Sequence, residues 1–204
     1  MKTHLIFTSL FLSSLAFSQN LTDFNEERLK TDQHLMIGLG SWATANFIGS
    51  GIGWATAPNE EMKSFHQMNV LWNTVNLGLA IPGYIRSKNE GSDLSFAETL
   101  HQQQRTEKIF LINSGLDIGY VSAGILLRSE AKTNLEKRDQ FNGFGNGLIL
   151  QGGFLLVFDM TAYFIHNRHL KNKLTPFFDN IQLSNNGIGI KWNITSSPKT
   201  CSFI

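Results

Sequence analysis

The chain has 204 residues, of which 42% are hydrophobic and 16% charged, with a formal net charge of +1 and one cysteine. A near-neutral chain without a basic cluster argues against a nucleic-acid partner. Cys201 has no second cysteine to pair with, which excludes an intramolecular disulfide. The mean hydropathy of −0.10 is low for a membrane protein, so a secreted soluble helical bundle stays an alternative fold.

The N-terminus has the pattern of a secretory signal peptide. Lys2 and His4 begin it, an apolar run extends from Leu5 to Phe17, and Ala16-Phe17-Ser18 provides an A-x-S cleavage site. The run is too short to cross the hydrocarbon core of a bilayer. We therefore predict a signal peptide over residues 1–18, through which the protein is exported.

Four later stretches carry at most one charged residue in their interior. They lie at about residues 35–57, 64–86, 108–128 and 142–166. Each is long enough to cross a bilayer as a helix, and soluble amphipathic helices normally carry charges along their outer face. The sequence predicts an all-α integral membrane protein, a four-helix transmembrane bundle of two helical hairpins over residues 19–176. The expected location is the bacterial cell membrane, as a multi-pass protein with the lipid bilayer as partner.

The C-terminal segment, residues 177–204, has a different pattern. Apolar and polar residues alternate from Ile188 to Thr195, which is the period of a strand. Asn185-Asn186-Gly187 would turn this strand back onto residues 181–183. A small β-hairpin outside the membrane is predicted here.

The second stretch carries a polar seam at helical spacing. Four polar residues alternate at spacings of three and four, which places them on one face of a helix: His66, Asn69, Asn73 and Asn76. A helix in lipid must turn such a face toward other protein. The seam therefore predicts the interior side of this helix.

Polar residues of the other stretches fall at similar depth. An ionised carboxylate at the bilayer centre costs about 2.5 to 3.5 kcal/mol on insertion scales, so two acids in this layer call for an explanation. The candidate ligand-binding residues are Asn46, His66, Asn69, Asn73, Asn76, Asn113, Asp117, Tyr120 and Asp159. They predict a mid-membrane site that binds or conducts a proton, a cation or a small polar ligand. The alternative is a structural or partner-binding membrane protein, in which these residues are interhelical hydrogen-bond glue.

Motifs of catalysis and metal binding are missing from the sequence. It has no G-x-S-x-G, no H-E-x-x-H and no phosphate-binding glycine loop, and no enzyme activity, catalytic residue or cofactor is predicted. His66 opens the second stretch and His166 closes the fourth, so antiparallel helices would hold them at opposite membrane faces. No metal site is predicted.

Glycines spaced by four residues occur in three of the four stretches: Gly49 with Gly53, Gly115 with Gly119, and Gly143 with Gly147. Such pairs let helix backbones approach closely in lipid. They favour a compact bundle and leave open a homo-oligomer formed through glycine-rich helix faces.

Two sequence blocks carry a family resemblance. Leu39-Gly40-Ser41-Trp42-Ala43 is the first, and Phe65-His66-Gln67-Met68-Asn69, followed by Trp72-Asn73 and Val75-Asn76, is the second. They resemble an uncharacterised family of small bacterial membrane proteins with a signal-like N-terminus and about four spans. The resemblance covers the first two stretches and implies membrane residence without a known activity.

Overall fold

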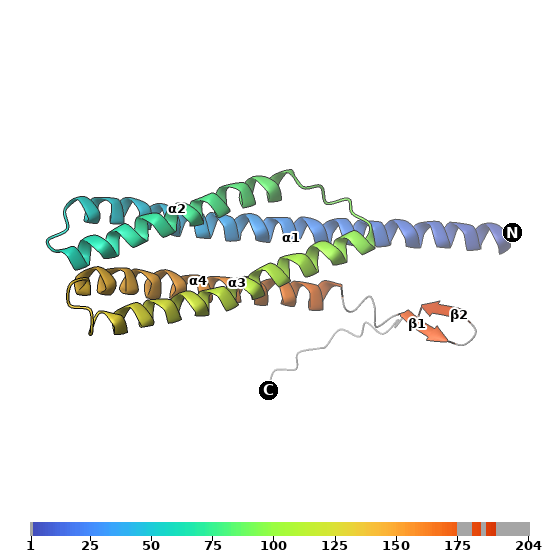
Figure 1. Ribbon diagram of the computed structural model, residues 1–204. Helices are drawn as coiled ribbons and strands as arrows, with labels where there is room; N and C mark the ends of the chain where they lie inside the picture. Colours follow the sequence, from blue (N-terminus) through green and yellow to red (C-terminus); the bar gives the residue numbers. More distant parts are fainter. Residues whose placement is uncertain (1, 175–180, 185–186, 191–204) are drawn as a thin grey trace, which may run out of the picture.

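The computed structural model describes residues 2–174, 181–184 and 187–190, with side chains from residue 19 to residue 174. The described elements are α1 (Lys2–Ala55), α2 (Glu60–Asn89), α3 (Phe96–Glu130), α4 (Arg138–Lys173), β1 (Ile181–Ser184) and β2 (Gly187–Ile190). α1 packs against α2 and α3 packs against α4 as two antiparallel hairpins. Both hairpin turns lie at one end of the elongated bundle, and the α2–α3 loop lies at the other (Figure 1).

Side-chain caps fix where the second and third helices begin. The side chain of Asn59 accepts a hydrogen bond from the backbone N–H of Met62 at 2.9 Å. Ser95 and Glu98 form a capping box, in which each side chain binds the backbone N–H of the other. Because a cap satisfies N–H groups that have no partner in the first helical turn, both loops end at a defined residue.

The two hairpins meet chiefly along α2 and α4, where glycines of α4 permit close approach. A Cβ atom added at Gly143 would meet the backbone carbonyl of Glu61 and would lie 2.7 Å from Cβ of Ser64. One added at Gly147 would lie 2.8 Å from Cγ of Met68. These two glycines therefore have a packing role between the hairpins.

The other glycine pairs do not pack in this way. A Cβ atom added at Gly49, Gly115 or Gly119 would have no atom within 4 Å, whereas one at Gly53 would meet the ring of His66. Gly115 and Gly119 are exposed on α3. The predicted homo-oligomer through such faces stays a prediction.

The interior of the described bundle holds little apolar material. One cluster joins Leu39, Ala80 and Leu155 near mid-bundle, and another joins Leu21, Phe24 and Leu174 toward the end with the α2–α3 loop. Between and around them are buried amide, hydroxyl, carboxyl and guanidinium groups. The packing of this fold therefore depends on polar contacts as much as on apolar ones.

The predicted fold class needs correction. Among the described residues only α3 and α4 are, by length and composition, candidate membrane spans, so the predicted bundle of four spans is wrong. α2 is not a candidate span because the buried asparagines of its polar seam lower the mean hydropathy of the helix. The architecture of the described residues is helical. The four-residue strands β1 and β2 pair with each other as a short antiparallel hairpin, with Ile181 opposite Ile190, and add no layer to the bundle.

Helix lengths also differ from the predicted stretches. α1 has 54 residues and runs from Lys2 through the predicted cleavage site to Ala55, and α3 has 35 residues, joining the polar run after Phe96 to the third stretch. At 1.5 Å per residue α3 is about 53 Å long, against about 30 Å for the hydrocarbon core of a bilayer. The signal peptide stays a prediction.

Replacing Gly143 by alanine should lower the free energy of unfolding by about 1–3 kcal/mol, since the new methyl group would press on backbone atoms of α2. The matched change Gly115→Ala adds a methyl group in open space and should be neutral or stabilising by up to about 1 kcal/mol through helix propensity. Thermal unfolding followed by circular dichroism compares the two. Equal stability of the variants would contradict the packing role of Gly143.

Candidate functional site

The seam of α2 faces the interior. Asn69, Asn73 and Asn76 are 0%, 0% and 2% exposed, as their helical spacing requires for a shared face. Nδ2 of Asn69 donates to the carbonyl of Phe65, and Nδ2 of Asn73 to the carbonyl of Asn69, both at 2.8 Å. Nδ2 of Asn76 donates to Oδ1 of Asn73 at 3.3 Å. These bonds within α2 leave Oδ1 of Asn69 for a partner on another helix.

That partner is Gln151 of α4, which is fully buried. Its Nε2 donates to Oδ1 of Asn69 at 2.5 Å, and its Oε1 accepts from Nε1 of Trp42 at 3.2 Å. The ring of Trp42 stacks on Phe154, with ring centroids 3.8 Å apart. A hydrogen-bonded amide chain, Trp42–Gln151–Asn69, therefore joins α1, α4 and α2 and satisfies groups that would be costly to bury unpaired.

A carboxyl pair, Asp117 of α3 and Asp159 of α4, is the second buried feature. The side chains are 2% and 5% exposed, and each is close enough to influence the ionisation of the other. Two neighbouring buried carboxylates repel each other, which favours a proton on one of them. Among the described residues, Oδ2 of Asp117 has no hydrogen-bond partner. The burial of both carboxyl groups therefore favours a pair that shares one proton.

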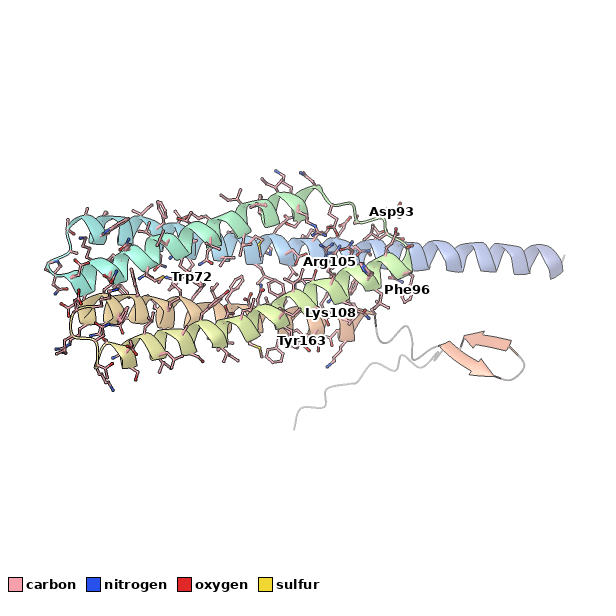
Figure 2. All side chains as sticks on the ribbon, in the orientation of Figure 1. Trp72, Asp93, Phe96, Arg105, Lys108 and Tyr163 are labelled. Carbon is pink, nitrogen blue, oxygen red and sulfur yellow. The ribbon has the colours of Figure 1, made fainter. Side chains whose placement is uncertain are left out.

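Close approach of α3 and α4 surrounds this pair with protein. A Cβ atom at Gly152 would lie 3.1 Å from the backbone oxygen of Asp117 and 3.1 Å from Cβ of Tyr120. The ring of Tyr120 packs edge-on against Trp72 of α2, with centroids 4.6 Å apart, and Figure 2 shows Trp72 on the side of α2 toward α4. The ring of Tyr120 therefore packs between α2 and α3, about one helical turn from Asp117.

Three predicted site residues lie apart from these contacts. Nδ2 of Asn46 donates to the carbonyl of Trp42 in its own helix at 2.9 Å, and Asn113 is half-buried. His66 packs against Gly53 near the α1–α2 turn, and its buried Nδ1 has no hydrogen-bond partner among the described residues. The predicted single polar layer is in fact an amide chain and a carboxyl pair.

A third polar group, here called the Arg28 cluster, lies toward the end of the bundle with the α2–α3 loop. Nη2 of Arg28 is 2.7 Å from Oε1 of Glu90, and Nη1 is 3.6 Å from Oδ2 of Asp32. Nε2 of His166, which is fully buried, lies 3.0 Å from Oδ1 of Asp32 without the alignment of a hydrogen bond. Nε2 of Gln103 donates to the carbonyl of His166 at 2.9 Å.

Sequence reasoning missed the Arg28 cluster and Gln151. The seven-residue spacing of Asp159 and His166 places both on one face of α4, but the predicted site residues did not include His166. Gln151 is an isolated polar residue in an apolar stretch, which is a usable signal. Arg28 and Asp32 stand in a charged run that has the same composition as a solvated helix face, so nothing in the sequence marked them.

Metal ligation is not indicated by the described side chains. They contain no group of three or more histidine, cysteine, aspartate or glutamate residues arranged to hold an ion. His66 and His166 lie near opposite ends of the bundle, beside Gly53 and Asp32 respectively.

The amide chain and the carboxyl pair both fall within one segment of the chain that matches a known sequence family. Residues 38–160 match the sequence profile of a family described as a family of unknown function, DUF6992. The chain belongs to DUF6992. The DUF6992 match includes both blocks of the resemblance and ends one residue beyond Asp159, whereas Arg28 and His166 lie outside it. The chain matches no curated protein and no solved structure.

Gln151→Leu should lower the free energy of unfolding by about 1–3 kcal/mol, because it leaves the buried Oδ1 of Asn69 without a partner. It also removes the acceptor of Nε1 of Trp42, whose side chain is partly buried. Trp42→Phe removes only one of the donors and should cost less. In the control, Thr74→Val, the lost hydroxyl is exposed and binds its own helix, so the change should stay within about 0.5 kcal/mol. Chemical denaturation measures the free energy of unfolding of all three variants. If Gln151→Leu were as stable as Thr74→Val, the amide chain would not contribute to the free energy of unfolding.

Proposed function

We propose that this protein resides in a membrane, with lipid covering its apolar surface. Large apolar side chains are exposed on the two candidate spans, among them Leu126 at 69% on α3 and Val157 at 67% on α4. Soluble monomers rarely expose contiguous apolar patches of more than a few hundred Å². The reversed distribution, with amides and acids inside and aliphatic side chains outside, supports lipid as the surrounding medium.

The charge pattern of the two candidate spans supports the same proposal. In α3 and α4 the sole charged residues over 109–127 and 140–165 are Asp117 and Asp159, and both are buried. The outer faces of these segments therefore present no charge to their surroundings. Both helices meet the length and composition expected of a membrane span.

A lysine on the outer face should prevent stable membrane residence. Ile118 is 56% exposed in mid-α3, and a lysine at the centre of a span costs about 2.5 to 3.5 kcal/mol on insertion scales. Ile118→Lys should therefore shift protein from the carbonate-resistant membrane pellet to the supernatant. The control Leu135→Lys, at a 75% exposed position in the α3–α4 turn, should leave the pellet unchanged. Release of the wild-type protein by alkaline carbonate would overturn the membrane proposal.

The proposed activity is reversible binding of a proton by the Asp117–Asp159 pair. One observation carries it: two carboxyl groups from neighbouring helices are buried beside each other, and two buried carboxyl groups at close range favour sharing one proton. Oδ2 of Asp117, which has no hydrogen-bond partner among the described residues, offers an acceptor for a proton donor or a small polar ligand. Ionisable groups inside a membrane protein are functional candidates by default.

A row of ionisable groups leads from the pair toward the end of the bundle. His166 lies two helical turns from Asp159 on the same side of α4, about 10 Å along the helix axis. His166 in turn approaches Asp32, and Asp32 lines a cavity at the bundle surface. An imidazole ring can accept a proton at one nitrogen and donate one from the other, so this row would provide a route between the pair and solvent.

The competing proposal is a purely structural role, in which a hydrogen bond between Asp117 and Asp159 joins α3 to α4 and its proton never exchanges. Interhelical hydrogen bonds in membranes contribute about 0.6 kcal/mol on average, so this role is small but real. It predicts the same folded yield for the Asn variants as the proton proposal does. The two proposals differ in whether the proton responds to bulk pH.

Infrared spectroscopy of the purified protein in lipid distinguishes these proposals. The wild type should show the carbonyl stretch of a protonated carboxyl group, shifted in D₂O and titrating with bulk pH. Asp117→Asn and Asp159→Asn should each change the pH at which that band titrates, because either change removes one member of the pair, and the double variant should abolish the band. The control Asp93→Asn changes an exposed loop residue and should leave the band intact. A band that ignores bulk pH wherever the protein stays folded would favour the structural role.

A further inference from the structure

A cavity opens between α1, α2 and α3 at the end of the bundle with the α2–α3 loop. Its volume is about 130 Å³, close to the ~150 Å³ of an engineered cavity known to hold benzene. Each of the three helices contributes one arginine to its lining: Arg28, Arg86 and Arg105. Such a space admits one small group, and the arginines favour an anionic one.

Arg28 is the buried arginine of the lining. Its side chain is 2% exposed, and its terminal nitrogens contact Glu90 and Asp32. Its Nε has no hydrogen-bond partner among the described residues. A buried guanidinium N–H without an acceptor is costly, and an anion in the adjoining cavity would supply that acceptor.

The charges of the lining do not cancel. Three arginines stand against two carboxylates, Asp32 and Glu90. Glu90 is shared, because its Oε1 lies 2.7 Å from Arg28 and its Oε2 lies 3.3 Å from Nε of Arg86. Among the described residues Arg105 has no ion pair, and Figure 2 places it on α3 near α1. The lining therefore keeps one positive charge in excess.

The remaining lining residues suggest what carries the anion. Gln102 and Thr106 add polar side chains on α3, while Met36 and Ile109 add apolar ones. Ile109 is 46% exposed and begins the uncharged segment of α3. The cavity thus stands at the boundary between charged and apolar surface, where an anionic lipid headgroup would lie.

We propose that this cavity binds a phosphate group. Guanidinium groups bind phosphate oxygens with paired, charge-assisted hydrogen bonds, and Arg28 and Arg105 supply unused donors to such a group. The phosphate can belong to an anionic phospholipid or to a free phosphate ion. The proposal is independent of the Asp117–Asp159 pair and holds whether or not that pair exchanges a proton.

Two binding measurements on the full-length protein in neutral detergent test this proposal. Native mass spectrometry measures retention of phosphatidylglycerol in competition with phosphatidylcholine, and calorimetry measures binding of inorganic phosphate with sulfate as competitor. Arg105→Gln should weaken the binding that the wild type shows by about tenfold, the loss of one charge-assisted contact. Arg168→Gln is the control, because it removes the same charge from an exposed site on α4 outside the lining.

The pattern of results identifies the source of the phosphate. Selective retention of phosphatidylglycerol without binding of inorganic phosphate indicates a lipid headgroup, and binding of inorganic phosphate indicates the free ion. Because Arg28→Lys alters a buried residue, its fold is first checked by circular dichroism; a folded variant should lose binding as Arg105→Gln does. The proposal is overturned if the wild type binds neither probe, or if Arg105→Gln and Arg168→Gln bind alike.

Discussion

Polar groups buried away from water must find partners within the protein, and the arrangement of this bundle follows from that requirement. Asn69 cannot satisfy both ends of its amide within α2, so it depends on Gln151 of α4, which in turn depends on Trp42 of α1. Arg28 likewise joins α1 to α2 through Glu90. In a bundle with few buried aliphatic side chains, these directional contacts determine which helix lies beside which.

Close backbone approach makes these contacts possible. Gly143 and Gly147 admit α2 against α4, and Gly152 admits α3 against α4. Short side chains such as Asn69 and Asp117 could not reach across helices held apart by larger residues. The glycines and the interior polar residues therefore act together. The glycines determine the distance between the helix axes, and the polar residues determine how the helices align along those axes.

Patterns confined to one helix were readable from the sequence. The 3–4 spacing of Asn69, Asn73 and Asn76 fixes their shared face whatever packs against it, and the two acids in uncharged stretches mark α3 and α4. Contacts between helices were not readable, because spacing on α2 does not say that Gln151 is the partner of Asn69. The charge-poor stretches were treated as separate units, so the predicted lengths of α1 and α3 were too short. A helix continues through a change from polar to apolar residues when its backbone hydrogen bonds are uninterrupted.

The interior residues of α4 have a mechanical consequence. Gln151, Asp159 and His166 each belong to a different polar group, and all three are fixed to one continuous helix. A rotation or axial shift of α4 would change the amide chain, the carboxyl pair and the contact with Asp32 together. Any ligand that moved α4 would thus alter all three sets of contacts at once, without any change inside the intervening helical turns.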